Sequence, residues 1–374
     1  MTEILFLHNT IMPYRVPFFL SVSKKFRVRY VFTDIRLAKT VYGRDPEHEV
    51  GFIARLDYTT IQGKFLTLRI LRELFLTDAN LYIDSFDRHG ITTFAIAKLR
   101  NKKIILWSEE WDWKEKCLLR QLFDPVYKLI VKNTDAILVP GSKHRDYYIS
   151  LGACSEKVFL MPNVSNISQK EEDIQNKQTL ATQLKIKDQK VILYVGRLVE
   201  RKGVDYLIRG FAKFKEDYNN TVLIIVGDGE CSTRLKTLAR DLGITDSVHF
   251  QGYVDDEYLA AYYLLSNVCV VPSITQGMGD PWVFIINEAM YFGKPVIASD
   301  AVGAAFDMVE NGKNGYIVPE RNSEAIYQAL KDILGNPDVE REMGHHSKQM
   351  INERFRYANM VEGFAAAVEY VWRK

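Results

Sequence analysis

The sequence predicts an α/β protein of two domains, each built on a parallel sheet. Short apolar runs alternate with stretches of helical spacing, an order typical of parallel sheets. The same order restarts near residue 190, after a polar, charged stretch at 164–190 that we interpret as the linker. A length of 374 residues also suits two domains. We therefore expect a first domain at 1–170 and a second at 180–356, facing each other across a cleft.

The first half offers one edge for binding a ligand. Ligands bind beyond the carboxyl ends of strands in open parallel sheets. The predicted strands are 4–7, 28–32, 81–83, 104–107 and 136–139, with helices at 17–25, 64–76, 91–100 and 118–132. The loops at this edge are 8–15, 84–90, 108–116 and 140–145, and within them we predict these ligand-binding residues: Asn9, Tyr14, Arg15, His89, Glu110 and Trp111.

The stretch 107–113, WSEEWDW, concentrates tryptophans and carboxylates after a buried strand. Aromatic faces beside carboxylates suit a sugar ligand, because rings stack and carboxylates accept hydrogen bonds. The alternative is that the tryptophans anchor the loop and the acids are solvated. No glycine-rich GxGxxG motif follows the first strand, which disfavours a nicotinamide-dependent oxidoreductase.

The stretch 272–299 organises the second half. A loop follows the strand 268–271, and Asp280-Pro281 has the form of an N-cap followed by proline at the first helical position. A helix start after a strand is an anion site, because its free N–H groups point at the loop. Glu288 follows Asp280 at a distance of about 12 Å along a helix. The two acids could hold the ends of a nucleotide-diphosphate sugar; alternatively Asp280 is only a cap and Glu288 is solvated.

A second loop of this half carries two cations. Arg197 and Lys202 lie in the segment 196–203, directly after the strand 191–195, and such a pair suits a diphosphate. The alternative is that both side chains are merely solvated. The other strands expected in this half are 221–226, 247–250 and 295–298, and the helices are 231–242, 256–265, 323–334, 338–354 and 357–372.

Composition limits the other classes of protein. The chain is 47% hydrophobic and 26% charged, with a net charge of +2, as in ordinary globular proteins. Four scattered cysteines without a CxxC pair disfavour a zinc site and suit a reducing, cytoplasmic compartment. Neither a signal peptide nor a membrane-spanning run is evident, and we expect no nucleic-acid partner. Residues 1–178 hold 27 Lys and Arg against 21 Asp and Glu, whereas the remainder holds 22 against 26. The first part is therefore mildly basic and the second mildly acidic.

Three motifs together resemble the retaining glycosyltransferases of family 4, which have the GT-B architecture. They are GRLVERKG, VGDGE and PSITQGMGDPWVFIINEAMYFGKPVIAS, and the resemblance is specific over roughly residues 190–320. It implies that Arg197 and Lys202 bind the donor diphosphate and that Glu288 holds the ribose. Asp280 occupies the position of a family glutamate that meets the donor sugar. The remaining donor-binding candidates are Gly196, Glu230, Tyr253, Pro281, Trp282, Val283 and Phe284, the last four through their backbone.

The resemblance also implies roles in the first domain, where the six ligand-binding candidates given above would be acceptor-binding residues. Glu109 stands where many family members have a histidine, so we assign it with Asp280 as a catalytic candidate. The C-terminal helix, within 357–374, is expected to pack back on the first domain through an apolar face that includes Val361 and Phe364.

The implied activity is transfer of a sugar, with retention, from a UDP- or GDP-sugar to a glycan or lipid-linked acceptor. No convincing DxD motif follows a strand, so we expect neither metal nor cofactor. An apolar helix face at 64–76, with Lys64, Arg69 and Arg72 elsewhere, predicts weak binding to the inner face of an anionic membrane. The alternative is a core-facing helix. A nucleotide-sugar epimerase or hydrolase, or a non-catalytic sugar-nucleotide binding protein, would share the same donor site.

Overall fold

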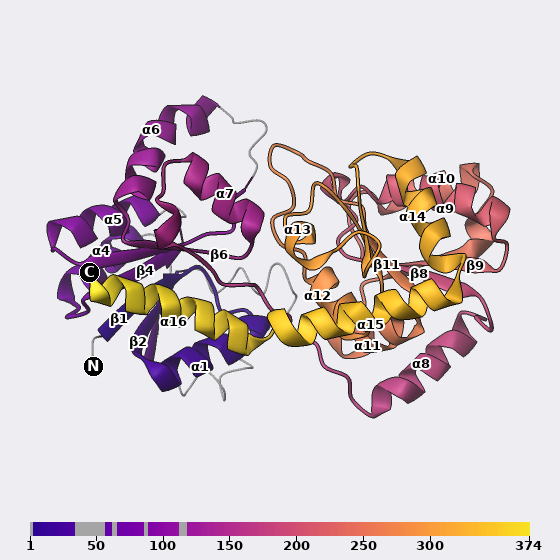
Figure 1. The fold of residues 1–374 in the computed structure, drawn as a ribbon, viewed down its shortest axis with the longest axis horizontal. Coiled ribbons are helices and arrows are strands. Elements are labelled where there is room, and N and C mark those ends of the chain that lie inside the picture. The colour runs from indigo at the N-terminus through magenta and orange to yellow at the C-terminus, as the bar shows by residue number, and fades with distance from the viewer. Residues whose placement is uncertain (1–2, 34–56, 62–65, 86–88, 112–117) are drawn as a thin grey trace. The chain divides into compact units, whose positions relative to one another are not determined.

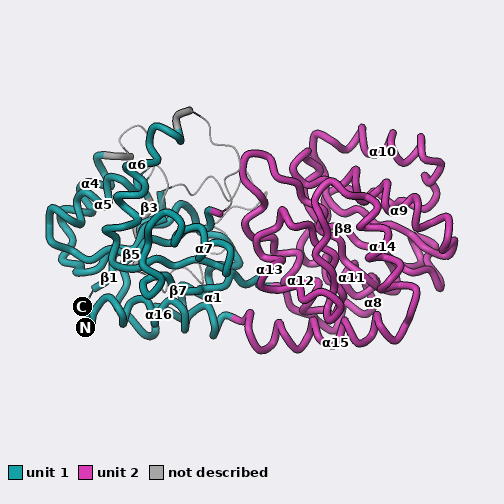
Figure 2. Tube along the Cα trace, turned by 45° about the horizontal axis from the view of Figure 1, so that its top comes forward, with its two compact units in different colours: residues 1–110, 116–166, 357–374 teal, residues 111–115, 167–356 magenta. Residues whose placement is uncertain are grey.

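The computed structural model describes residues 3–33, 57–61, 66–85, 89–111 and 118–374. The chain divides into two compact units, coloured separately in Figure 2. Unit 1 comprises residues 1–110, 116–166 and 357–374, and unit 2 comprises residues 111–115 and 167–356. The chain thus passes between the units at Asn166–Ile167, where the sequence placed domain limits at 170 and 180.

Unit 1 is built on a seven-stranded sheet in the order β3-β2-β1-β4-β5-β6-β7, whose pairs are all parallel. The strands are β1 Glu3–His8, β2 Arg27–Phe32, β3 Asp57–Thr60, β4 Leu81–Ser85, β5 Lys103–Trp107, β6 Ala136–Val139 and β7 Val158–Leu160. Their burial is nearly continuous, as expected of a parallel sheet covered on both faces.

Helices cover both faces of this sheet (Figure 1). Alternate residues of a strand point to opposite faces, so Phe6 packs with helices α1 and α16 while Leu5 and Leu7 pack with α4 and α5. The helices are α1 Val16–Lys25, α4 Leu66–Leu76, α5 Gly90–Leu99, α6 Leu118–Asn133, α7 Ser142–Ser150 and α16 Tyr357–Arg373, with 3-10 turns at Pro13–Arg15 and Ser155–Lys157.

The C-terminal helix α16 packs on unit 1, which confirms the expectation from the sequence. Its buried face includes Val361, Phe364 and Val368. The Phe364 ring stacks on Phe6 with centroids 6.0 Å apart and meets Phe18 at 5.6 Å. A helix late in the chain thereby completes the core of the first unit.

Unit 2 has a six-stranded parallel sheet in the order β10-β9-β8-β11-β12-β13. The strands are β8 Lys190–Val195, β9 Thr221–Val226, β10 Val248–Gly252, β11 Val268–Val271, β12 Val296–Ser299 and β13 Gly315–Val318. The carboxyl ends of these strands share one edge, so the loops after β8, β9, β10 and β11 gather there.

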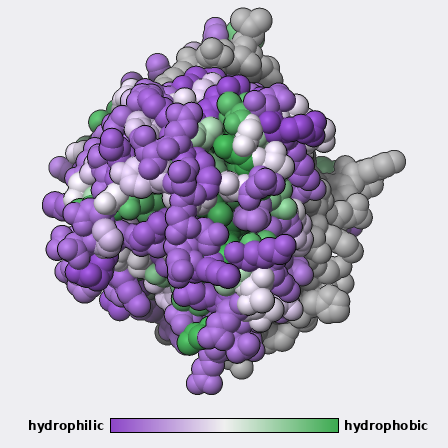
Figure 3. All heavy atoms as spheres, turned by 90° about the vertical axis from the view of Figure 1, so that its right-hand side faces the viewer, coloured by the Kyte–Doolittle hydropathy of each residue, from purple (hydrophilic) through white to green (hydrophobic). Residues whose placement is uncertain are grey.

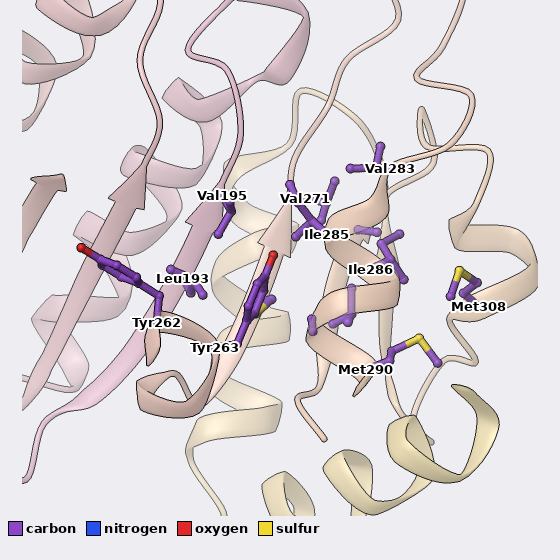
Figure 4. Close-up of a cluster of buried hydrophobic side chains, with 14 of the residues drawn as sticks. Leu193, Val195, Tyr262, Tyr263, Val271, Val283, Ile285, Ile286, Met290 and Met308 are labelled. Atoms are coloured by element: carbon purple, nitrogen blue, oxygen red, sulfur yellow. The ribbon is translucent and has the colours of Figure 1, made fainter. Parts of the chain in front are cut away.

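Two helix layers also enclose this sheet. The helices are α8 Glu172–Gln183, α9 Val204–Asp217, α10 Ser232–Asp241, α11 Asp256–Leu265, α12 Phe284–Tyr291, α13 Ala305–Met308, α14 Ser323–Leu334 and α15 Pro337–Arg354, with 3-10 turns at Glu200–Lys202 and Thr245–Ser247. Figure 4 shows part of one core layer, in which Ile285 of α12 lies beside Val271 of β11, with Ile286 and Met290 farther along the same helix. Figure 3 shows the side of unit 2 that lies at the right of Figure 1, a mostly hydrophilic face with scattered apolar areas.

The predicted linker at 164–190 is wrong for part of its length, because residues Glu172–Gln183 form α8. This helix packs on α11 and buries Leu180 in the core of unit 2. Its apolar residues are few, and Ile174 is 53% exposed, so the sequence shows almost no apolar face. Packing against α11, rather than a strong sequence pattern, accounts for this helix.

Candidate active site

Loops after β8 and β11 meet at the carboxyl edge of the unit 2 sheet. The Ile274 N–H donates to the carbonyl of Arg201 at 2.8 Å. Gly203 has φ of 60°, and a Cβ there would lie 2.1 Å from the carbonyl oxygen of Pro272. Only glycine tolerates both the left-handed backbone and this close approach. The glycine of the GRLVERKG motif therefore brings Arg201 and Lys202 against the loop that carries Asp280.

The carboxylate of Asp280 holds three donors. Arg201 Nη1 lies 2.7 Å from Oδ1, and Lys202 Nζ lies 2.5 Å from Oδ2. The Ser273 hydroxyl also donates to Oδ2, at 2.9 Å. Burial alone would raise the pKa of this carboxyl, but the charges of Lys202 and Arg201 outweigh burial and lower it. Asp280 is thus an ionised, buried anion between two cations.

Asp280 is not the helix cap that the sequence predicted. Helix α12 begins at Phe284 with Val283 in the N-cap position, so proline is not at its first position either. The Asp280 N–H donates to Ala301 and its carbonyl accepts from Gly303. These bonds pair Asp280 with the segment after β12 in an extended form, which the following proline also favours. A simple cap role for this carboxylate is excluded.

Other donor-site candidates follow the neighbouring strands. Gly196 and Arg197 come directly after β8, and the Arg197 side chain is exposed. Glu230 follows β9 and Tyr253 follows β10, and both are exposed, Tyr253 to 64%. The edge therefore presents Arg197, Glu230 and Tyr253 to solvent, beside the ion-paired Lys202.

Helix α12 contributes Glu288 one turn after its start. The Tyr263 hydroxyl, on α11, donates to Glu288 Oε2 at 2.6 Å. Burial raises the pKa of Tyr263 well above its ordinary value, so it stays a donor at neutral pH. Tyr263 orients the glutamate, and the sequence analysis missed it because nothing in the spacing of residues 263 and 288 marks a pair.

The segment 281–284 offers mainly its backbone. Trp282 and Val283 are 7% and 5% exposed, while Pro281 and Phe284 are half-buried. The Trp282 indole donates to Asn287 Oδ1 at 3.1 Å, which turns the ring into the core.

A second cluster of polar residues lies at the carboxyl edge of unit 1. The buried Arg15 donates through Nη2 to Glu109 Oε1 at 2.9 Å and through Nη1 to Asn163 Oδ1 at 2.7 Å. Asn163 also donates to Glu109 Oε1, at 2.7 Å. The Arg15 guanidinium lies 4.7 Å from the Trp107 ring centroid. Arg15 and Glu109, which the sequence predicted separately, are brought together, with Asn163 as a third member that the sequence did not reveal.

The neighbouring Glu110 belongs to a different network. Arg120 Nη2 donates to Glu110 Oε2 at 2.8 Å, and the Tyr127 hydroxyl donates to the same oxygen at 3.0 Å. Tyr127 in turn lies 2.6 Å from the Tyr148 hydroxyl. These contacts tie β5 to α6 and α7, so they favour a structural role for Glu110.

The remaining candidates of the first half are dispersed. Asn9 accepts from the Thr10 N–H at 2.8 Å, and the carbonyl of Tyr14 accepts from the Tyr357 hydroxyl of α16 at 2.6 Å. His89 is buried at the start of α5. Trp111 is buried and grouped with unit 2, its ring centroid 6.1 Å from that of Phe306. These positions support an anchoring role for Trp111 more than a sugar-stacking surface.

Comparison with known proteins assigns this chain to a family. A model of "Glycosyl transferases group 1" matches residues 176–350. An uncharacterized glycosyltransferase of Haemophilus influenzae is 32% identical over 327 residues, which are 85% of this chain and 85% of that protein.

The chain belongs to the group 1 glycosyltransferases.

Further relatives agree with this assignment. A GDP-mannose-dependent alpha-(1-6)-phosphatidylinositol monomannoside mannosyltransferase of Mycobacterium tuberculosis is 27% identical over 244 residues. These are 64% of the present chain and 63% of the mannosyltransferase. The crystal structure of Anabaena Alr3699/HepE in complex with UDP covers 98% of this chain and 100% of its own, with a TM-score of 0.79 and 17% identity. The structural likeness confirms the predicted α/β fold of GT-B type.

The described part of this glycosyltransferase contains no group of three or more His, Cys, Asp or Glu side chains arranged to hold a metal ion. Within the same residues, each helix is too short or too polar to cross a bilayer.

Proposed function

We propose that this glycosyltransferase is a retaining enzyme of family 4. It transfers a sugar from a UDP- or GDP-sugar to a hydroxyl of a glycan or lipid-linked acceptor. The observation that carries this proposal is the pair of cations, Lys202 and Arg201, gathered by Asp280 at the carboxyl edge of the unit 2 sheet. A site of this kind suits the diphosphate of a nucleotide sugar. The Anabaena neighbour was also solved in complex with UDP-glucose, which supports a nucleotide-sugar donor.

The chemistry proposed for the site is stabilisation of a leaving diphosphate. As the bond between the sugar and the diphosphate breaks, negative charge grows on the departing oxygen. Lys202 and the exposed Arg197 supply fixed positive charge there, so we propose that no metal ion is needed. Glu288, oriented by Tyr263, is assigned to the ribose hydroxyls.

In unit 1 we assign Glu109 to the acceptor. Its Oε1 accepts from Arg15 and Asn163, while Oε2 makes no hydrogen bond within the described residues. The side chain is 38% exposed, so Oε2 is accessible to a hydroxyl. Two donors on one oxygen hold the carboxylate in a fixed orientation. Glu109 is thus suited to accept a hydrogen bond from the acceptor.

A panel of UDP- and GDP-sugars tests the proposal. We expect one donor to raise the melting temperature of the protein and to release its nucleotide diphosphate only when an acceptor is present, including in EDTA. Nuclear magnetic resonance of the product should show the anomeric configuration of the donor. Equal release without acceptor would indicate a hydrolase, an inverted product would contradict retention, and loss of turnover in EDTA would contradict metal independence.

We also propose that unit 1 binds anionic membrane surfaces peripherally, at the cytoplasmic face. Helix α4 buries Ile70 and Leu74 but leaves Leu68 and Leu76 exposed to 62% and 70%. Both predicted alternatives for this helix therefore have support, since one face is core and another is apolar and solvent-exposed.

A further inference from the structure

Arg201 is a cation that the motif analysis did not assign. Its Nη1 donates to Asp280 Oδ1 at 2.7 Å, and its side chain remains 35% exposed. The guanidinium makes no other hydrogen bond or ion pair within the described part of the chain. A guanidinium has five N–H donors, so most of those of Arg201 are available to a ligand. Arg197, in contrast, is exposed and has no side-chain contact with Asp280.

Asp280 is poorly placed to contact a ligand through its carboxylate. The side chain is only 5% exposed, and its two oxygens already accept from Arg201, Lys202 and Ser273. Its backbone is fixed as well, by hydrogen bonds with Ala301 and Gly303. A carboxylate so enclosed acts on the groups that surround it. Those groups are Ser273 and the two cations of the loop after β8.

We propose that Arg201 binds the donor diphosphate together with Lys202, and that Asp280 is the positioning residue that holds both cations. This inference rests on the proposed function, because it assumes a diphosphate ligand at this edge. It differs from the family expectation in two respects. Asp280 acts through Arg201 and Lys202 instead of contacting the donor sugar, and Arg201 joins the phosphate-binding cations.

Charge and geometry both favour this assignment. Arg201, Lys202 and Asp280 together carry a net charge of +1, so the group retains attraction for an anion after the ion pairs have formed. The planar guanidinium offers parallel N–H donors that match two phosphate oxygens, while the ammonium of Lys202 offers a compact charge. Anchoring by Asp280 also reduces the side-chain freedom that Arg201 would lose when a ligand binds.

The ion pair is not the only tie between the two loops. The hydrogen bond from Ile274 N–H to the Arg201 carbonyl and the close approach at Gly203 involve backbone atoms. Both remain when the Arg201 side chain is removed. We therefore expect Arg201→Ala to fold, which makes the binding test interpretable.

Isothermal titration calorimetry of the full chain with UDP, GDP and inorganic pyrophosphate tests the proposal. We expect Arg201→Ala to weaken the binding of pyrophosphate and of whichever nucleotide binds by about tenfold or more, and to reduce its salt dependence. Arg201→Lys should recover part of this loss because it restores the charge without the planar fork. Arg209→Ala, an exposed arginine of α9, is the matched control and should bind as the parent does.

A double-mutant cycle tests the role of Asp280. If Asp280 positions Arg201, the loss caused by Arg201→Ala should be larger with Asp280 present than in an Asp280→Asn background. Equal losses in both backgrounds would contradict positioning. Unchanged affinity and salt dependence in Arg201→Ala, with only a lower melting temperature, would make the ion pair purely structural. A parent protein that binds neither nucleotide nor pyrophosphate would contradict the donor site itself, and with it the proposed function.

Discussion

At the scale of single residues, the donor site depends on contacts that sequence spacing does not show. Spacing predicted Asp280, Lys202 and Glu288 as site residues because each belongs to a motif. It did not single out Arg201, although this residue lies inside the GRLVERKG motif, or Tyr263, since each meets its acidic partner only in the folded chain. The same holds for Asn163, which joins Arg15 across 148 residues. Local pattern identifies motif residues, but their partners depend on the sheet topology.

The ion pairs of Asp280 predict a pH-dependent contribution to folding. The folded pKa is lowered from the ordinary value of 3.8, so this contribution is present above about pH 4 and is lost as the pH falls through the folded pKa. We expect Asp280→Asn to be less stable than the parent by about 1–3 kcal/mol at pH 7, with a smaller difference at pH 3.5.

Urea unfolding followed by circular dichroism at pH 7, 5 and 3.5 measures this difference. Asp241→Asn, at an exposed position of α10, serves as the control and should match the parent at each pH. A difference between parent and Asp280→Asn that does not change with pH would show that the charge of Asp280 does not contribute.

His8 predicts a second pH effect, in unit 1. Its ring lies among Phe6, Phe19 and Trp107, and burial, aided by the charge of Arg15, lowers its pKa to about 3. In the unfolded chain the His8 ring takes up a proton near pH 6.5, whereas in the folded chain it does so only near pH 3. The free energy of unfolding is therefore unaffected by His8 above pH 6.5 and falls as the pH is lowered toward 3. The loss from His8 reaches up to about 2 kcal/mol at pH 5.

The variant His8→Asn should reduce this dependence, because its amide can donate to the Thr10 carbonyl as the ring does without titrating. Thermal melting at pH 7 and pH 5 compares it with the parent and with His345→Asn, an exposed histidine of α15. The same fall in stability in the parent and in His8→Asn would remove His8 as its cause.

At the scale of elements, burial on both faces made the central strands predictable, whereas three of the four edge strands were not predicted. Strands β1, β5, β8 and β9 are apolar runs, and the structure has them within about a residue of the expectation. The edge strands β3, β7 and β13 are three or four residues long, and β3 reads DYTT, which carries no apolar pattern. Pairing with an existing strand, and not local sequence, defines these edges.

Helix α4 carries the membrane prediction. Its exposed Leu68, Phe75 and Leu76 accompany the exposed Arg69 and Arg72, a combination that suits an anionic bilayer surface. Lys64, which the sequence added to this set, lies outside the described residues. We expect salt-sensitive cosedimentation with vesicles that contain anionic lipid, and loss of binding in a Leu68→Glu, Leu76→Glu variant.

The control for this experiment is Ile174→Glu, which changes an exposed apolar residue of α8 in unit 2. This variant should cosediment as the parent does. A parent protein that stays in the supernatant at low salt would contradict the membrane proposal and leave α4 with its core-facing role alone.

At the scale of the whole molecule, the organisation into two units was predictable from repetition in the sequence. Two series of strands and helices predicted two α/β units, and the resemblance to GT-B enzymes implied that the last helix, which has an apolar face, packs back on unit 1. The predicted start of α12 was wrong. Asp280-Pro281 has the local form of a helix cap, whereas pairing with Val302 holds Asp280 in an extended conformation. Long-range pairing thus overrode a local signal at the residue on which the site depends.

The central claim is that the carboxyl edge of unit 2 binds a nucleotide-diphosphate donor through Lys202. Calorimetric titration of the parent, Lys202→Ala and Lys213→Ala with UDP and GDP tests it most directly, since Lys213 is an exposed lysine of α9 paired with Glu324. We predict that one nucleotide binds the parent and Lys213→Ala equally, and that Lys202→Ala weakens this binding by about 1.5–3 kcal/mol. Equal affinity of all three proteins for that nucleotide would contradict the claim.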